Sequence, residues 1–440
     1  MKRKSLLKIL SIITLVIMAL STLTGCKLLE IFGGGHKHDY KSQITPPTCT
    51  ADGFTTYTCE CGDTYTGNPT PKVSHSFVNY TSNGNGTKTG TCVYGCGETE
   101  TIPEAQILGE MSFHFPMLGN ASTGDSVFIE AGEFDILIDC GSQVGSAEVV
   151  KNYLDENNLV DDGVLEFVIV THADEDHIAG FSSTGERNMF KYYECEIIID
   201  FNLSNKALLT DKNNDTTYGK YIKARDNEVS LGAKHYTALD CYNNTNGASR
   251  TYSLGEGMSM SVLYNYFYDH QSSDENNYSV CTLFTHGDRN FLFTGDLEIE
   301  GEEYLVEYNT LPQVELYKAG HHGSKTSSND CLLDIIKPKI CVVCCCAGTD
   351  EYTDEVKNQF PTQDFIDRIS KHTDKVYVPL IGDTNYTDGG KAFSALNGNI
   401  KVLSVSSGVS VSCSHSDILL KDTDWFKNKR TTPTAWQQAS

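Results

Sequence analysis

The residues best suited to chemistry lie together in one six-residue stretch, His-Ala-Asp-Glu-Asp-His at 172–177. The stretch directly follows an apolar Phe-Val-Ile-Val run that is typical of a β-strand. On an extended or tightly turning backbone, His172 and Asp174 project to one side, whereas the adjacent Asp176 and His177 can point to two different places. One short loop can therefore serve two neighbouring cations, which is the arrangement that two-metal hydrolysis needs.

Further candidates follow other apolar, strand-like runs, each of which has a carboxylate or an imidazole beyond its far end. They are Asp139, Asp296, His321 and His322. Each motif is weak alone, but several strand ends gathered along one edge of a sheet would form a single acidic, His-bearing cleft. Asp296 suits a bridge between two cations because it has two carboxylate oxygens.

This mixed set of imidazoles and carboxylates predicts two divalent cations, either zinc or manganese, since His favours zinc and an extra carboxylate makes the site more tolerant of manganese. A cation pair lowers the pKa of a bridging water, which generates hydroxide, and neutralises charge on a phosphoryl oxygen during in-line attack. The expected ligands of the first cation are His172, Asp174 and one of His321 and His322, and those of the second are Asp176 and His177.

Other residues are expected to support this chemistry. Asp139 orients ligands rather than binding metal itself, and Asp125 either does the same or only fixes the geometry of its loop. Ser324 and Lys325 fit anion binding near a loop or helix start, where free backbone N–H groups point outward; an ordinary polar turn is the alternative. Together with Asp176, Ser324 and Lys325 form the predicted catalytic set.

With these motifs, the chain from about 107 to 420 resembles metallo-β-lactamase-fold hydrolases, most of all the extracellular domain of the ComEC competence family. The resemblance includes Asp174 as the third residue of the 172–177 motif, Thr-Gly-Asp ending at Asp296, and Gly-His-His-Gly-Ser-Lys-Thr-Ser-Ser ending at Ser328. It implies an α/β fold, an αββα sandwich, and hydrolysis of an anionic phosphodiester, with extracellular nucleic acid as the first-choice substrate.

The chain departs from this pattern in two places. Many members carry a further His before the strand that leads to Gly-Asp, whereas this chain has Glu275 to Ser279 there. Asn277, Ser279 or Glu275 would have to substitute. The family's later His-Pro step is here Phe360-Pro361, so a proton donor or a phosphate contact is expected to be missing.

The N-terminus predicts the location. A basic start and an apolar run from about 9 to 20 have the size of a signal peptide. The run leads to Leu-Thr-Gly-Cys, which resembles a bacterial lipobox with Cys26 as the lipidated residue; a plain transmembrane anchor is the alternative. We therefore expect a signal peptide at 1–25, a lipid-anchored tether at 26–35, and a mature protein on the outer face of the bacterial cell membrane.

Residues 36–104 form a predicted separate module of two rough Cys/His-rich repeats. Thr-Tyr-Thr-Cys and Thr-Gly-Thr-Cys steps align the repeats, and small Gly- and Thr-rich units with few core residues need staples. Structural zinc and disulfides both fit, since the Cys spacing allows metal and an exported location allows oxidation; free thiols are the third alternative. The candidate residues are His38, Cys49, Cys59, Cys61, His75, Cys92 and Cys96.

The hydrolase domain is predicted at 105–420, with an insertion at about 203–258 that overhangs the cleft, and a polar, loose tail at 421–440. Adjacent cysteines 344–346 are expected on opposite faces of a strand as buried small hydrophobes. The expected strands are 134–139, 165–171, 196–200, 279–285, 290–294 and 339–346, and the expected helices are 146–158, 329–337 and 363–371.

The acidic composition affects the choice of substrate. Lys and Arg total 34 against 58 Asp and Glu, a formal net charge of −24. Proteins that bind long nucleic acid usually have a stripe of basic residues that contact the phosphates. This chain has only the isolated Lys318 and Lys325 near the metal motifs. The sequence therefore predicts a surface-anchored two-metal phosphodiesterase or nuclease. The alternatives are a hydrolase of envelope phosphodiesters such as teichoic acid and a non-catalytic envelope-binding lipoprotein.

Overall fold

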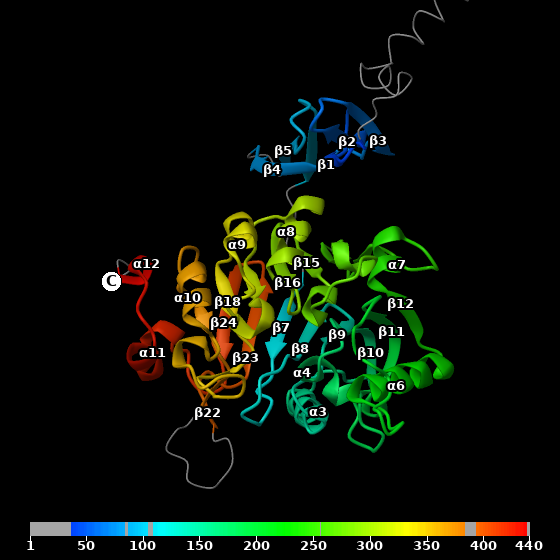
Figure 1. The fold of residues 1–440 in the computed structure, drawn as a ribbon. Helices are drawn as coiled ribbons and strands as arrows, with labels where there is room; N and C mark the ends of the chain where they lie inside the picture. The colour runs from blue at the N-terminus through cyan, green and yellow to red at the C-terminus, as the bar shows by residue number, and fades with distance from the viewer. Residues whose placement is uncertain (1–36, 84–86, 104–108, 256, 383–392, 438–440) are drawn as a thin grey trace, which may run out of the picture. The chain divides into compact units, whose positions relative to one another are not determined.

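The computed structural model describes residues 37–83, 87–103, 109–255, 257–382 and 393–437 (Figure 1). The chain divides into two compact units, Met1–Ala105 and Gln106–Ser440. The predicted signal peptide, the tether and Cys26 lie outside the described residues. None of the helices in the described ranges combines the length and the apolar character that crossing a membrane requires.

The first unit contains two three-stranded antiparallel sheets, ordered β1-β2-β3 and β4-β5-β6. Most side chains of β1 and β3 are exposed, so these sheets bury little apolar surface, as the composition of the repeats predicts. The strands are β1 Tyr40–Thr45, β2 Gly53–Cys59, β3 Thr64–Thr70, β4 Phe77–Ser82, β5 Thr87–Cys92 and β6 Thr99–Pro103.

The second unit begins with an eight-stranded mixed sheet ordered β12-β11-β10-β9-β8-β7-β23-β24. Neighbouring strands from β9 to β12 are parallel and the others are antiparallel. The strands are β7 Met111–Phe115, β8 Val127–Ala131, β9 Phe134–Ile138, β10 Val164–Ile169, β11 Glu194–Asp200, β12 Lys234–Thr237, β23 Ile400–Val405 and β24 Gly408–Cys413.

A seven-stranded sheet, ordered β13-β14-β15-β16-β17-β18-β20, forms the other half of this unit, and β19-β21-β22 form a small third sheet. The strands are β13 Thr251–Ser253, β14 Met258–Val262, β15 Thr282–His286, β16 Arg289–Phe293, β17 Leu316–Lys318, β18 Ile340–Val342, β19 Cys346–Ala347, β20 Val376–Tyr377, β21 Leu380–Gly382 and β22 Phe393–Ala395.

The two large sheets pack face to face through aromatic side chains. Phe113 of β7 has its ring centroid 4.5 Å from that of Phe291 and 5.7 Å from that of Phe293, both on β16. Leu292, between them, points to the other face and joins a separate core, as the two-residue period of a strand requires.

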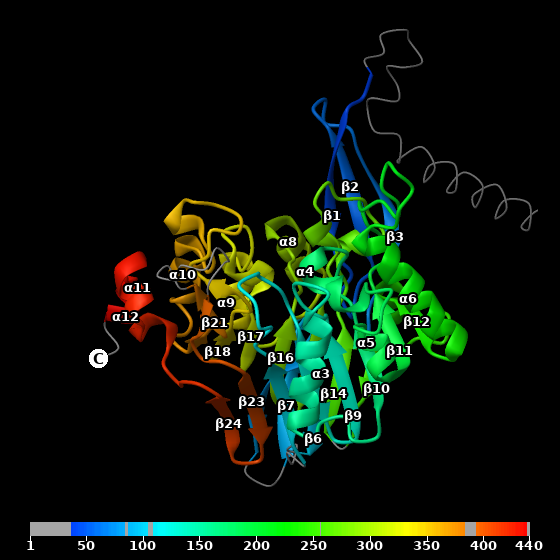
Figure 2. The ribbon, with the colours of Figure 1, turned by 90° about the horizontal axis from the view of Figure 1, so that it is seen from below.

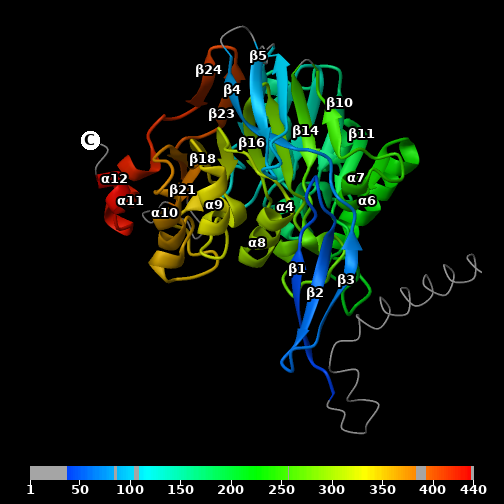
Figure 3. The same cartoon turned by 90° about the horizontal axis from the view of Figure 1, so that it is seen from above.

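Helices cover the outer faces of both sheets (Figures 1, 2 and 3). Leu305, Leu333 and Phe365 of α8, α9 and α10 join the outer core that contains Leu292, and Val150 of α3 joins the core of the first sheet. This is the predicted αββα sandwich. The helices are α3 Ser146–Glu156, α4 Glu175–Ile178, α5 Met189–Tyr192, α6 Thr217–Leu231, α7 Ala238–Asn243, α8 Ile299–Tyr308, α9 Asp330–Ile336, α10 Gln363–Ile369, α11 Asp424–Lys429 and α12 Thr434–Gln437.

Two expectations about the fold need revision. Residues 203–258 are not only an insertion at the site, where Lys206 pairs with Asp174, because β12 also extends the first sheet, parallel to β11. The tail is not loose, because Phe426 and Trp436 are buried and Trp436 Nε1 donates a hydrogen bond to Thr373 O at 3.0 Å. Sequence alone showed neither, since both depend on surfaces that distant strands and helices provide.

The predicted strand at 339–346 is also interrupted, since β18 ends at Val342 and β19 begins at Cys346. The cysteines in between nevertheless behave as expected. Cys344 is buried in the core shared by the two sheets, whereas Cys345 belongs to the core beneath the outer helices.

Candidate active site

The candidate site lies where neighbouring strands end. Parallel pairing of β9 with β10 sets Ile138 opposite Ile169, so the segment after each strand emerges at the same edge of the sheet. Asp139 follows β9 directly, and its carboxylate accepts hydrogen bonds from Thr171 N at 2.8 Å and Thr171 Oγ1 at 2.7 Å. Adjacent strand ends thus bring residues 33 positions apart in sequence, Asp139 and His172, into one site.

The Thr-Gly-Asp turn after β16 delivers Asp296 to the same place. Gly295 has a φ of +54°, and a Cβ at this position would lie 2.9 Å from Thr171 Cβ and 2.7 Å from Ser279 Oγ. Only glycine therefore allows the turn to approach the first sheet so closely. Ser279 Oγ accepts a hydrogen bond from Asp296 N at 3.0 Å and fixes the turn.

Four ligand-type side chains converge at this point: Asp176, His177, Asp296 and His322, each of which offers an atom within 4.8 Å of the others. Asp296 Oδ2 lies 2.9 Å from His322 Nε2 and 3.1 Å from His177 Nε2. Asp176 Oδ2 lies 3.3 Å from His322 Nε2. We call these four residues the central group.

Second partners fix the orientation of both imidazoles in the central group. His177 Nδ1 donates to Asp139 Oδ2 at 2.7 Å, and His322 Nδ1 donates to Cys344 O at 2.9 Å. Each Nε2 therefore faces the carboxylates and is buried without a hydrogen bond of good geometry. Buried polar atoms rarely lack partners, and an imidazole oriented through its other nitrogen is the usual arrangement of a metal ligand. The central group therefore fits a divalent cation.

The electrostatics agree with this interpretation. Burial opposes ionisation of Asp296, but His177, His322 and Lys318 outweigh burial and hold the pKa of this carboxyl well below its ordinary value. Burial likewise opposes a charge on His177, but Asp296 and Asp139 raise its pKa well above the ordinary value. Positive charge thus stabilises the buried carboxylates. When no cation is bound, protonated imidazoles supply this charge.

A buried ammonium group supplies further positive charge. Lys318, the last residue of β17, has an exposed fraction of only 2%. Its Nζ forms an ion pair with Asp125 and lies 3.2 Å from Asp296 Oδ1. Asp125 Oδ1 in turn lies 3.2 Å from His322 Nδ1. Asp125 therefore links Lys318 to a ligand of the central group, in the supporting position that the sequence left open.

Comparison with known proteins identifies this unit. A family model of the metallo-beta-lactamase superfamily matches residues 119–200 and 273–347, and these ranges contain the whole central group. The second unit is a metallo-beta-lactamase superfamily domain. The resemblance inferred from the motifs and the predicted fold class are thereby confirmed.

Two curated proteins are similar to parts of this chain. ComE operon protein 3 of Bacillus subtilis is 26% identical over 184 residues, 41% of this chain and 20% of that protein. Recombination protein 2 of Haemophilus influenzae is 33% identical over 69 residues, 16% of this chain and 8% of that protein. This chain thus spans a fifth or less of the length of these relatives.

The matched solved structures are more distant. A motif mutant of a metallo-beta-lactamase from Cronobacter sakazakii is 13% identical, with a TM-score of 0.29, and the match covers 46% of this chain and 74% of that one. A diphosphatase of the PhnP family is 10% identical, with a TM-score of 0.30, and the match covers 53% and 85%.

In the metallo-beta-lactamase domain, the two adjacent histidines have separate positions. His322 joins Asp176 and His177, the ligands expected for the second cation, and not His172 and Asp174. His321 turns away, and its Nδ1 lies 3.1 Å from Glu298 Oε1 and 3.1 Å from Thr326 Oγ1. The expectation that one of this pair serves the first cation is therefore not met by the geometry.

The proposed first-cation ligands form only a pair. His172 Nε2 lies 3.4 Å from Asp174 Oδ2 and is buried without a hydrogen bond. Asp174 also forms an ion pair with Lys206, a residue that the sequence motifs did not single out. Within the described part of the second unit, the site thus has the central group of four ligand-type residues and, beside it, the less complete pair of His172 and Asp174.

The residues in place of the family's extra His have three different roles. Ser279 Oγ lies 3.4 Å from His172 Nδ1 and supports that ring. Asn277 Oδ1 accepts a hydrogen bond from Glu298 N at 3.3 Å, a contact outside the central group. Glu275 holds the backbone behind the 172–177 loop, because it accepts from Ala173 N at 3.3 Å and Asn205 N at 2.6 Å.

Ser324 and Lys325 are not brought into the central group by any contact of the described residues. Ser324 Oγ lies 2.9 Å from Thr326 Oγ1, which is the ordinary polar turn that the sequence also allowed. Lys325 is exposed. Their assignment as catalytic stays a prediction, whereas Lys318 is in direct contact with Asp296 of the central group.

A tyrosine at the edge of the site was not foreseen. Tyr352 OH donates a hydrogen bond of 3.3 Å to Asp176 Oδ2, and its ring centroid lies 5.4 Å from that of Phe360. Partial desolvation and the negative charge of Asp176 raise the pKa of Tyr352, an otherwise exposed side chain, so the phenol stays protonated. Tyr352 lies 176 positions from Asp176, and no local motif marks it.

Proposed function

We propose that the metallo-beta-lactamase domain is a metal-dependent hydrolase of phosphodiesters. The observation that supports this most directly is the central group, in which two buried imidazoles present Nε2 to two carboxylates. A cation bound there would supply Lewis acidity, activating water and neutralising charge on a phosphoryl oxygen. The pair formed by His172 and Asp174 is the proposed place of a second, more weakly held cation.

The protein's own groups prepare the site for this reaction. Asp139 and the carbonyl of Cys344 hold the imidazoles in the tautomer that exposes Nε2. Ser279 fixes both His172 and the Asp296 turn. Tyr352, protonated and beside Asp176, is placed to donate a proton to a departing oxygen. It is a candidate for the proton donor that the absent His-Pro step would provide.

The substrate class is proposed from two observations that point in different directions. The name of one curated relative, Recombination protein 2, supports nucleic acid. The net charge of −24 opposes tight binding of a long polyanion. Among the described residues, Lys206 is the only exposed lysine that forms an ion pair with a proposed metal-ligand carboxylate, that of Asp174. Nucleic acid is therefore the first candidate, and an envelope phosphodiester such as teichoic acid is the second.

The location is proposed from the sequence alone. The basic start, the apolar run and the lipobox-like step before Cys26 support export and a lipid anchor on the outer face of the bacterial cell membrane. An anchored enzyme would meet extracellular or envelope polymers. Labelling with a radioactive fatty acid, lost after Cys26→Ala, tests the anchor separately from the catalytic proposal.

The enzyme is tested with bis-p-nitrophenyl phosphate and the full-length protein, supplied with manganese or zinc. Asp176→Ala removes a ligand of the central group, and Glu175→Ala is the matched control because its neighbouring carboxylate is exposed. We expect metal-dependent turnover that Asp176→Ala abolishes and Glu175→Ala retains.

Each other outcome has a definite meaning. Bound metal without turnover of this substrate would overturn the phosphodiesterase proposal and direct attention to other esters and amides. Protein that binds no metal and turns nothing over would leave the non-catalytic binding protein. Turnover that survives Asp176→Ala would show that the central group is not the active site.

A further inference from the structure

The two halves of the first unit share a construction in which a histidine faces two cysteines. In each half the His ring stacks on the aromatic ring two positions later: His38 on Tyr40 at 5.4 Å and His75 on Phe77 at 5.9 Å between centroids. The following three-stranded sheet brings a Cys at the end of its second strand back to this histidine, and a further Cys follows in the turn.

The turns also match. Gly62 N donates to Cys59 O at 2.8 Å in the first half, and Gly95 N donates to Cys92 O at 3.0 Å in the second. Each half thereby contributes one imidazole and two thiols. The resulting groups are His38, Cys59 and Cys61 in the first half, and His75, Cys92 and Cys96 in the second.

The second group has a fourth member that comes from the first half. Cys49 Sγ lies 3.6 Å from Cys92 Sγ, and all four ligand atoms lie within 4.8 Å of one another. Two hydrogen bonds bring the halves together here: Val73 N donates to Thr48 O at 3.1 Å, and Lys72 N donates to Asp52 Oδ1 at 2.7 Å. The linker before His75 is therefore fastened to the bend that carries Cys49.

Two of the separations between ligand atoms are close to those of a tetrahedral metal site. With Zn–S near 2.3 Å and Zn–N near 2.0–2.1 Å, tetrahedral angles place two sulfurs about 3.8 Å apart, and a sulfur about 3.6 Å from a nitrogen. The observed separations are 3.6 Å between Cys49 and Cys92 and 3.4 Å between Cys96 Sγ and His75 Nδ1. A disulfide would instead need sulfurs about 2.05 Å apart, and Cys49, Cys92 and Cys96 form none in the structure.

We propose that Cys49, His75, Cys92 and Cys96 bind one structural zinc ion that joins the two repeats. Three thiolates and one imidazole form a closed Cys₃His set, the type that structural zinc prefers. Because Cys49 belongs to the first repeat, the ion makes one folding unit of two sheets that bury little apolar surface. The binding free energy of the metal then contributes directly to folding.

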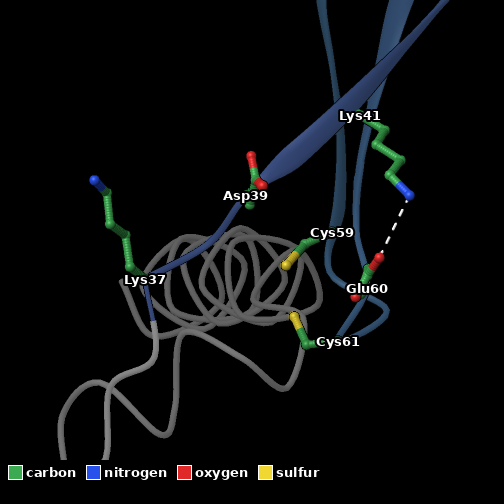
Figure 4. A pocket seen from close by; sticks show the side chains of 6 residues that line it. All are labelled: Lys37, Asp39, Lys41, Cys59, Glu60 and Cys61. Atoms are coloured by element: carbon green, nitrogen blue, oxygen red, sulfur yellow. Dashed lines mark hydrogen bonds and ion pairs between the residues drawn. The ribbon is translucent and has the colours of Figure 1, made fainter.

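The first repeat provides an internal comparison. Its group has three members among the described residues, and Cys59 and Cys61 point their sulfurs toward one another beside an open pocket (Figure 4). In the second group, the fourth ligand Cys49 precedes His75 in sequence. A fourth ligand placed in the same way for the first group would precede His38. A change at Cys49 should therefore affect the second site and leave the first unchanged.

Cobalt(II) is a probe that separates this site from the hydrolase site in the full-length protein. Thiolate-to-cobalt charge-transfer absorption arises only where cysteine binds the metal, and the central group of the second unit has only nitrogen and oxygen ligands. We expect wild-type protein to show this absorption and to hold one tightly bound zinc that Cys49→Ser releases. Cys331→Ser, a half-buried cysteine in the second unit, is the control that retains both.

A second measurement keeps the proposal testable if Cys49→Ser fails to fold. In wild-type protein, mass spectrometry maps the alkylation of each thiol before and after a chelator is added. We expect Cys49, Cys92 and Cys96 to become reactive together after chelation. Three results would each overturn the proposal. They are full cobalt absorption in Cys49→Ser, alkylation of Cys49 that is the same with and without the chelator, and a Cys49–Cys92 disulfide in zinc-free native protein.

Discussion

His177 Nδ1 donates a hydrogen bond of 2.7 Å to Asp139 Oδ2, although the two residues are 38 positions apart. This contact determines which nitrogen of His177 faces the central group. Asp139 has a φ of +57°, a conformation that costs a non-glycine residue on the order of 1 kcal/mol or more. A strained residue at this position is tolerated because its carboxylate also accepts two hydrogen bonds from Thr171.

Asp139→Asn tests the orienting role. An amide can present its NH₂ to His177 Nδ1, which then favours the tautomer that carries a proton on Nε2. We expect metal affinity and turnover to fall about 10–100-fold, the usual effect of removing a partner behind a metal-binding histidine. Asp135→Asn is the control, because Asp135 stands on the same strand, β9, and is only half-buried. Isothermal titration with zinc gives the comparison, and equal affinities in both variants would contradict the role.

Lys318→Met tests the charge balance of the site. Removal of the ammonium leaves Asp125 and Asp296 buried without their partner, which typically costs about 3–5 kcal/mol. We expect this loss in the metal-free protein and a smaller loss with metal bound, because a cation supplies part of the missing positive charge. Urea unfolding with and without zinc measures both values.

Lys339→Met is the matched control for that experiment. Lys339 pairs with Glu315 at 2.6 Å, but its side chain is 65% exposed, and exposed pairs contribute about 1 kcal/mol or less. If Lys318→Met lost no more stability than Lys339→Met, Lys318 would not be balancing buried charge.

The sequence could predict much of this site because its chemistry follows local patterns. An apolar run with a carboxylate or imidazole beyond it indicates a strand end, and parallel strands place such ends at one edge. Asp139, Asp176, His177 and Asp296 follow this rule. The sandwich itself was predictable from the family motifs. The strand pattern alone would not have shown which sheet each strand joins.

Other features depend on contacts that no local pattern encodes. His321 and His322 are adjacent and identical in type, and both have positive φ values; only the tertiary packing directs His322 inward, with its Nδ1 on Cys344 O. Lys206 reaches Asp174 from a segment that the sequence presented only as an insertion. Asp125 was visible as a motif residue, but its partner Lys318 was seen only as a nearby charge.

Glu302 of α8 predicts a pH dependence of stability. Complete burial raises its pKa to about 7. Hydrogen bonds from the Ser327 hydroxyl and from the backbone N–H groups of Ser328 and Asn329 oppose this shift, because they favour the ionised form. The folded-state pKa exceeds the ordinary value of 4.5, so the protein is most stable when Glu302 is protonated. This contribution to the free energy of unfolding is fully present below about pH 4.5. It is lost as the pH rises through about 7.

The measurement is the free energy of unfolding at pH 5 and pH 8. Glu302 should contribute a decrease of up to about 3 kcal/mol between these values. Glu302→Gln cannot ionise, so we expect it to remove this part of the decrease. Glu303→Gln, at the exposed neighbouring position, should retain it. A pH profile in Glu302→Gln that matches that of Glu303→Gln would rule out a raised pKa at Glu302.

Tyr352→Phe tests the proton donor at the edge of the site. The phenol donates to Asp176 at 3.3 Å and keeps its proton because partial desolvation and that carboxylate raise its pKa. A general acid contributes about 10²–10⁴-fold to the rate only when the leaving group needs a proton. We therefore expect Tyr352→Phe to lower kcat strongly for a dinucleotide or an alkyl phosphodiester, and to change it little for bis-p-nitrophenyl phosphate, whose nitrophenolate leaves without help.

The comparison between the two substrates separates proton donation from a structural role. A variant that merely disturbed Asp176 would lose activity on both substrates to the same degree, and its zinc content would fall. Tyr308→Phe is the control, because Tyr308 is a partly exposed tyrosine of α8 without a contact to the central group among the described residues. Equal losses on both substrates would show that Tyr352 positions Asp176, and unchanged kcat on the alkyl substrate would show that the proton comes from elsewhere.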